Sequence, residues 1–78
     1  MADRIVFRVL PDRGRWKVTR NSEFDASFDT KEPAVDYATE RARTAYAEGS
    51  PSQVIIARAD GTIEDERTYG EDPYPPRG

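Results

Sequence analysis

The side chains that could do chemistry in this chain are mostly carboxylates. The sequence holds 15 Asp and Glu residues but no histidine and no cysteine, so the commonest general base and the thiolate nucleophile are both missing. Glu64, Asp65 and Glu66 are consecutive, and in a strand the middle side chain would point away from the other two. We therefore interpret these carboxylates as solvated surface groups rather than as a catalytic pair.

Hydroxyl nucleophiles and ligand-binding loops give no stronger signal. Ser27, Thr30 and Tyr69 have no histidine to activate them. The glycines are scattered rather than grouped in a phosphate-binding loop, and Asp-Gly-Thr-Ile-Glu at residues 60–64 lacks the length and ligand pattern of a calcium loop. We predict no enzyme activity, no catalytic residue, no cofactor and no metal.

The charge is unevenly distributed along the chain. Residues 1–20 carry six basic and two acidic side chains, and the remaining 58 residues carry a net charge of −7, which gives −3 overall. Arg8, Arg15 and Lys17 would share one face of an N-terminal hairpin and could contact nucleic-acid phosphates. The exposed aromatics of an RNA-binding sheet are not expected there, because Phe7 and Trp16 point to the opposite face. The basic residues could instead pair across strands with acidic ones such as Glu64 and Glu66.

Two strands must position these basic residues. Ile5, Phe7 and Val9 alternate with other residues, and a turn at 11–14 leads to a second alternating stretch with Trp16 and Val18. A period of two predicts a half-buried hairpin whose core side holds these five residues. A turn at 21–23 and a short third strand around residues 26–28 follow.

A helix is predicted from about residue 31 to 48. Thr30 is a suitable N-cap, Pro33 is tolerated in the first turn, and Gly49-Ser50-Pro51 ends the helix. One side of the helix carries apolar residues at helical spacing, and its small side chains predict a close approach to a sheet. These residues are Val35, Ala38, Ala42, Ala45 and Tyr46.

Two more strands, residues 53–59 and 62–68, flank Asp60-Gly61. This dipeptide predicts a two-residue hairpin turn with positive φ at both positions. The resulting register opposes Ala59 with Thr62, Arg58 with Ile63, Ile56 with Asp65 and Ile55 with Glu66. Val54, Ile56 and Ile63 would then share the core face, and a slip of one residue would invert the assignment.

These elements predict an α+β fold, a single antiparallel sheet of four to five strands (β-β-β-α-β-β along the chain) with one helix packed on one face. The expected strand order across the sheet is 3-2-1-5-4. The face away from the helix stays open and is the predicted interaction surface. Its candidate residues are Arg8, Arg15, Lys17, Ile55, Glu64 and Glu66. We predict a non-enzymatic protein-interaction or accessory module, with an unknown protein or a second copy as partner; the alternative is a nucleic-acid-binding module that uses the basic hairpin.

The order of several short motifs resembles a bacterial family known as domain of unknown function 2188. The motifs are Trp16-x-Val18, Phe28-x-Thr30-Lys31-x-x-Ala34, Asp60-Gly61-x-Ile63 and Thr68-Tyr69-Gly70-x-Asp72-Pro73. The resemblance implies a small β-β-β-α-β-β domain over nearly the whole chain and no known activity. Many members of that family carry a histidine just before the Asp-Gly turn, where this chain has Ala57-Arg58-Ala59.

The chain is expected to form one domain, residues 1–70, followed by a proline-rich flexible tail, residues 71–78. Pro73-Tyr74-Pro75-Pro76 would be either a solubilising end or a polyproline ligand. The N-terminal residues lack the pattern of a signal peptide, and the longest apolar run, Val54-Ile55-Ile56-Ala57, is far too short to span a bilayer. We expect a cytoplasmic protein with no membrane contact.

Overall fold

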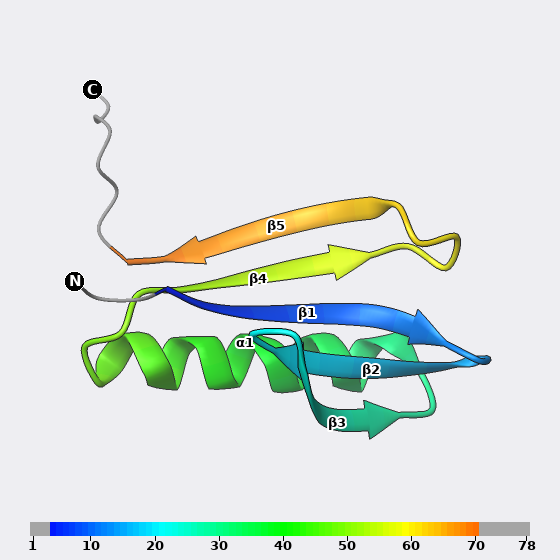
Figure 1. Ribbon diagram of the computed structural model, residues 1–78, viewed down its shortest axis with the longest axis horizontal. Coiled ribbons are helices and arrows are strands. Elements are labelled where there is room, and N and C mark those ends of the chain that lie inside the picture. Colours follow the sequence, from blue (N-terminus) through cyan, green and yellow to red (C-terminus); the bar gives the residue numbers. More distant parts are fainter. Residues whose placement is uncertain (1–3, 71–78) are drawn as a thin grey trace.

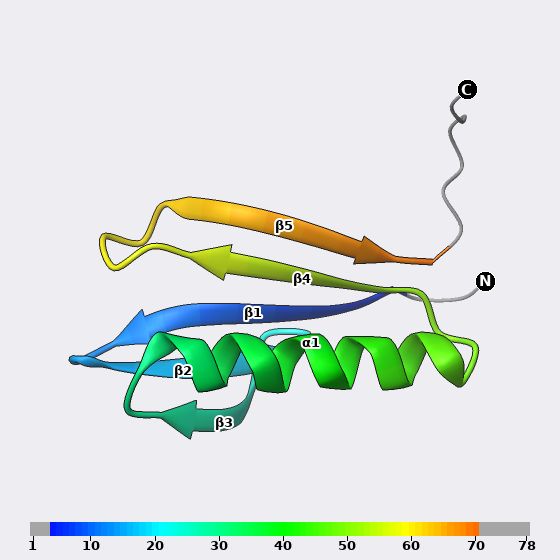
Figure 2. The ribbon, with the colours of Figure 1, turned by 180° about the vertical axis from the view of Figure 1, so that it is seen from behind.

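The computed structural model describes residues 4–70, so the predicted tail at 71–78 lies outside the described residues. Five strands form one sheet, and a single helix lies on one of its faces (Figures 1 and 2). The elements in chain order are β1 (Ile5–Asp12), β2 (Arg15–Arg20), β3 (Glu23–Phe28), α1 (Lys31–Ala47), β4 (Ser52–Ala57) and β5 (Ile63–Tyr69). The predicted α+β class and element order are confirmed.

The sheet is mixed, which corrects the predicted all-antiparallel sheet. Its order is β3-β2-β1-β4-β5 instead of 3-2-1-5-4, and β1 pairs with β4 in parallel. Helix α1, which is 17 residues long, carries the chain back along the sheet. Strand β4 therefore begins beside the start of β1 and runs in the same direction (Figure 1).

The β1–β2 and β2–β3 connections are two-residue turns with positive φ at both positions. Arg13 and Gly14 have φ of 55° and 81°, and Asn21 and Ser22 have φ of 51° and 73°. This geometry matches the twist of the flanking strands. The first turn is shorter than the predicted 11–14 segment, because Pro11 and Asp12 belong to β1.

The β4–β5 connection differs from the predicted two-residue turn. Gly61 has φ +93°, and Asp60 is not among the residues with positive φ. The Gly61 amide donates to the Arg58 carbonyl at 2.9 Å, and the Arg58 amide donates to the Thr62 carbonyl at 2.7 Å. The loop is therefore longer than predicted, and the expected pairs Ala59–Thr62 and Arg58–Ile63 do not form.

A bulge in β5 changes which face its first residues occupy. Ile56 opposes Asp65 and Ile55 opposes Glu66, as predicted, but Ala57 opposes Ile63. Strand β5 thus has one extra residue at this point, and such a residue breaks the strict alternation of faces. Ile63, predicted in the core, is 52% exposed.

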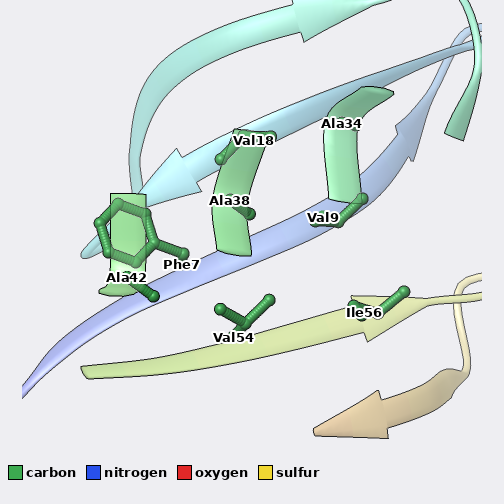
Figure 3. Close-up of a cluster of buried hydrophobic side chains, with 8 residues drawn as sticks. All are labelled: Phe7, Val9, Val18, Ala34, Ala38, Ala42, Val54 and Ile56. Carbon is green, nitrogen blue, oxygen red and sulfur yellow. The ribbon is translucent and has the colours of Figure 1, made fainter. Parts of the chain in front are cut away.

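The core lies between α1 and the sheet (Figure 3). It consists of five sheet residues and three helix alanines, namely Phe7, Val9, Val18, Val54, Ile56, Ala34, Ala38 and Ala42. Ile5 and Trp16, predicted in this core, are only partly buried at its margin. The Lys31 ammonium lies 5.4 Å from the centre of the Trp16 ring.

Helix α1 ends one residue before the predicted position, with Glu48 as its C-cap. Thr30 is the N-cap residue, but its side chain makes no capping hydrogen bond. The fully buried helix residues are the three alanines, whereas Tyr46, predicted on the buried side, is 48% exposed. Alanines allow the helix axis to approach the sheet closely, as the sequence predicts.

Candidate functional site

One face of the sheet has no helix over it. Figure 1 shows this open face toward the viewer, and Figure 2 shows α1 in front of the opposite face. Side chains of a strand alternate between the two faces. Because Phe7, Val9 and Val18 are buried under α1, the residues between them, Arg8 and Lys17 among them, belong to the open face.

The strand registers arrange the middle of the open face in one row across all five strands. The row runs from β3 to β5 as Phe24, Thr19, Arg8, Ile55 and Glu66. Phe24, at the β3 end of the row, is 68% exposed. Apolar, cationic and anionic groups therefore lie side by side along one line.

A second row lies next to the first. Lys17 opposes Ser27 on one side and Leu10 on the other. Ala57 opposes Ile63 at the far edge. Leu10 and Ala57 directly follow Val9 and Ile56, the last pair of the two parallel strands. This row adds apolar area beside Arg8.

Four of the six predicted contact residues lie together on the open face: Arg8, Lys17, Ile55 and Glu66. Arg15 is on this face too, by alternation with Lys17, but as the first residue of β2 it lies at the rim, where its Nε is 3.2 Å from Asp29 Oδ1. Glu64 is elsewhere, because the bulge turns it toward α1 and it forms an ion pair with Lys31. The placement of Glu64 on the open face is therefore wrong.

The expected cross-strand pairing of the basic residues with Glu64 and Glu66 does not form. Glu66 Oε1 accepts a hydrogen bond from Gln53 at 3.4 Å, and Glu64 is taken by Lys31. Among residues 4–70, neither Arg8 nor Lys17 has a carboxylate within 4.0 Å. Both are partly buried. Within the described part of the chain, these two cations therefore lack an anionic partner and lie next to the apolar residues Leu10 and Ile55.

Thr19 is the functional candidate that the sequence analysis missed. It lies between Phe24 and Arg8 in the row and is only 7% exposed, yet within the described part of the chain its Oγ1 has no hydrogen-bond partner. Buried polar atoms are nearly always satisfied, so such an atom requires an explanation. Strand alternation with Lys17 could have placed Thr19 on this face. Phe24 could not be placed, because its position depends on the bulge in β3.

A groove of about 380 Å³ lies on the other face, between the first half of α1 and β5. Val35 and Ile56 contribute apolar lining, and the charged lining residues include two ion pairs, Lys31–Glu64 and Arg67–Asp65. Arg67 also donates to Thr39 Oγ1 of α1 at 3.4 Å. The Lys31–Glu64 and Arg67–Thr39 contacts tie the edge strand β5 to α1, which is a structural role for these charges.

Residues 4–70 hold neither a metal centre nor a membrane-spanning helix. No group of three or more histidine, cysteine or acidic side chains there is arranged to hold a metal ion. None of the helical structure in that range is long and apolar enough to cross a membrane. The absence of catalytic activity and of a cofactor stays a prediction.

The fold and the site define a small α+β domain with a five-stranded sheet, one covered face and one open face. The chain belongs to the bacterial family described as "Uncharacterized protein conserved in bacteria (DUF2188)", whose family model matches residues 7–69. No protein with a curated description matches the chain significantly, and neither does any solved structure. The family resemblance carried by the sequence motifs is confirmed, and the function of the family is not known.

Proposed function

We propose that this protein is a non-catalytic interaction module that binds a partner protein through the open face of its sheet. The observation that carries the proposal is the polar cluster of Arg8, Lys17 and Thr19, which has no ion-pair or side-chain hydrogen-bond partner among residues 4–70 and lies beside Leu10 and Ile55. Surfaces that combine apolar area with a few unmet polar groups are typical of contact sites between proteins.

The chemistry of the face favours a partner that brings one carboxylate and apolar side chains. Arg8 and Thr19 are directly opposite each other, and Lys17 is two residues from Thr19 along β2, so the three groups lie within about 8 Å of one another. A single anion could contact all three. Leu10, Ile55 and Ala57 would receive the apolar groups next to it.

Site-specific photo-crosslinking in the native cell tests this proposal. A benzophenone amino acid replaces Leu10 on the open face, and the same substitution at the exposed Tyr46 of α1 serves as the control. We expect a discrete protein adduct at position 10 that disappears when Arg8→Glu is added, and no matching adduct at position 46. Equal adducts at both positions, or an adduct insensitive to Arg8→Glu, would contradict the proposal.

Nucleic-acid binding is the second candidate, and one observation favours it. Phe24 is exposed in the same row as Arg8 and Thr19, which is the kind of aromatic on which a base can stack. The net charge of −3 opposes it. An NMR titration with short single- and double-stranded DNA and RNA decides the question: shifts in β1 and β2 that weaken steeply with salt support this candidate, and their absence excludes it.

The cytoplasm stays the predicted compartment, on the sequence argument alone. Fractionation of the native cell, followed by detection of the untagged protein, tests it.

A further inference from the structure

We infer that the open face binds a second copy of this chain, with the two sheets stacked face to face around a twofold axis parallel to the strands. The inference rests on the proposed function, because it names the partner of the same surface. The inference depends on the order of residues within the two rows. The twofold rotation places residues of each row opposite complementary residues of the same row in the second copy.

The proposed axis lies off the central strand β1, between β1 and β4. An axis midway between β1 and β4 places β1 over β4 of the second copy, and β2 over β5 of the second copy. The operation leaves positions along the strand direction unchanged, so each row stacks on itself in reverse order. Two packed sheets lie about 10 Å apart with interdigitated side chains, a distance these side chains can bridge.

In the first row this operation brings unlike groups together. Glu66 of the second copy lies over Thr19, next to Arg8 on the neighbouring strand and to Lys17 two residues along β2. Its carboxylate would accept from the Thr19 hydroxyl and meet both cations, so the three groups that lack a partner among residues 4–70 each gain one. The twofold axis repeats the contact, and the interface contains this anion site twice.

In the second row the same operation pairs a large side chain with a small one. Leu10 lies over Ala57 of the second copy, and Ala57 lies under Leu10 of the second copy. Ala57 is 2% exposed, so neighbouring side chains already cover it, and its small side chain adds little height to the face. Opposed large and small residues allow two sheets to interdigitate without a void.

Two other arrangements of two copies lack this complementarity. A twofold axis perpendicular to the strands and in the plane of the sheet stacks β2 on β2, which brings the Lys17 region of one copy toward the same cationic region of the other. Edge pairing through β5 would align a strand that carries Glu64, Asp65 and Glu66 with itself, and charged edges of this kind oppose edge-to-edge association.

The size of the face sets the expected strength. Five strands spaced about 4.8 Å apart and about six residues long give a face of roughly 20 Å by 20 Å. Stacking two such faces, with β3 outside the overlap, covers roughly 800 Å² in total, below the usual range for specific interfaces. The dimer should therefore exchange rapidly, with a dissociation constant in the micromolar to millimolar range.

A charge-swap experiment tests the inference. Sedimentation equilibrium up to 1 mM should show self-association of the wild type, and both Arg8→Glu and Glu66→Lys should weaken it at least tenfold. An equimolar mixture of the two variants should regain it, because one site then holds Glu at position 8 against Lys at position 66 and the other site is native. Glu40→Lys, the same charge change on α1, is the control and should leave association unchanged.

Thr19→Val supplies a second test that a folding defect cannot mimic. Removing an unsatisfied buried hydroxyl should leave the melting temperature of dilute protein unchanged or raise it, while dimerisation weakens about two- to tenfold. Chemical-shift changes with concentration should map to the open-face residues of β1, β2 and β4.

Three outcomes would overturn the dimer. They are a wild-type monomer at 1 mM, association that the mixed variants do not rescue, and shift changes confined to α1 or to the sheet edges. If the position-10 crosslink to a different protein persists in any of these cases, the proposed function stands with another partner. If that crosslink is also missing, the dimer and the proposed function both fail.

Discussion

Ser52 and Thr19 are two buried hydroxyls with opposite surroundings. Ser52 is 0% exposed and donates to the Ala42 carbonyl at 2.7 Å, which joins β4 to α1. Thr19 is almost as buried, but within residues 4–70 its hydroxyl has no partner. The hydroxyl of Ser52 therefore stabilises the fold, whereas that of Thr19 makes no stabilising hydrogen bond with the described residues.

Replacing Ser52 by alanine should destabilise the protein. The substitution removes a buried hydrogen bond and should lower the free energy of unfolding by about 1–2 kcal/mol. Urea denaturation measures this, with Ser27→Ala on the exposed part of β3 as the control. A loss no larger than that of the control would show that the Ser52–Ala42 bond contributes nothing.

Asp60 gives the β4–β5 loop a pH dependence. Its Oδ1 accepts from the Thr62 hydroxyl at 2.7 Å and from the Thr62 amide at 2.9 Å, and these bonds, with a smaller contribution from the charge of Arg58, hold the pKa of the carboxyl below its usual value. A depressed pKa means that the stabilisation is present above the unfolded value of about 3.9 and is lost as the pH falls through the lower folded value.

We therefore expect the loop to keep its order down to pH 4 and lose it at lower pH. An NMR titration of the Thr62 amide should give a midpoint below that of an unstructured peptide of residues 57–63. Asp60→Asn should remove the titration from the Thr62 amide. A midpoint equal to or above that of the peptide would contradict the assignment.

At the scale of elements, the alanine stripe of α1 sets the distance between helix and sheet. Ala34, Ala38 and Ala42 are all 0% exposed and lie above β1 and its neighbours (Figure 3). Interiors are close-packed, so the addition of even a few atoms at such a contact forces the helix away or strains the rotamers.

Ala38→Leu should accordingly destabilise the protein, although leucine is a strong helix former. We expect a loss of about 1–3 kcal/mol in the free energy of unfolding, measured by thermal and urea unfolding. Ala47→Leu, at the exposed end of the same helix, is the control and should change stability little. Similar effects for the two variants would show that the helix–sheet contact can expand.

The elements differ in how far their sequences determine them. The helix bounds could be predicted to one residue, because Thr30, Pro33 and the Gly49-Ser50-Pro51 stop mark both ends. The β4–β5 hairpin could not, because Asp60-Gly61 fits two loop geometries. The choice between them depends on the Asp60–Thr62 hydrogen bonds and on the bulge at Glu64. That single extra residue turned Glu64 to the helix side and Ile63 to the open side.

At the scale of the whole molecule, strand order was the main error of the sequence analysis. The apolar run Val54-Ile55-Ile56-Ala57 suits an interior strand, whereas the charged 64–67 segment suits an edge. This difference in composition favours a position for β4 next to β1. The prediction of an all-antiparallel sheet placed β5 there instead. The open face was nonetheless predictable, because alternation within β1 and β2 depends on neither strand order nor loop type.

Trp16 lies where the β1–β2 hairpin, β3 and the start of α1 meet. The stability of the whole domain should therefore be sensitive to this one side chain. It opposes Pro11 of β1 and Phe28 of β3, packs against the core, and lies 5.4 Å from the Lys31 ammonium at the start of α1. At 0.05–0.15 kcal/mol per residue, a domain of this size has roughly 4–12 kcal/mol of stability.

Trp16→Ala should remove about 2–4 kcal/mol of that stability, somewhat less than for a fully buried tryptophan because the ring is partly exposed. Far-UV circular dichroism should show a lower melting temperature in one cooperative step, because sheet and helix lose a shared contact. Tyr46→Ala, which removes a 48% exposed aromatic ring from the outer side of α1, should leave the melting temperature nearly unchanged. An unaltered melting temperature for Trp16→Ala would mean that the Trp16 ring contributes nothing to holding the N-terminal hairpin against the helix.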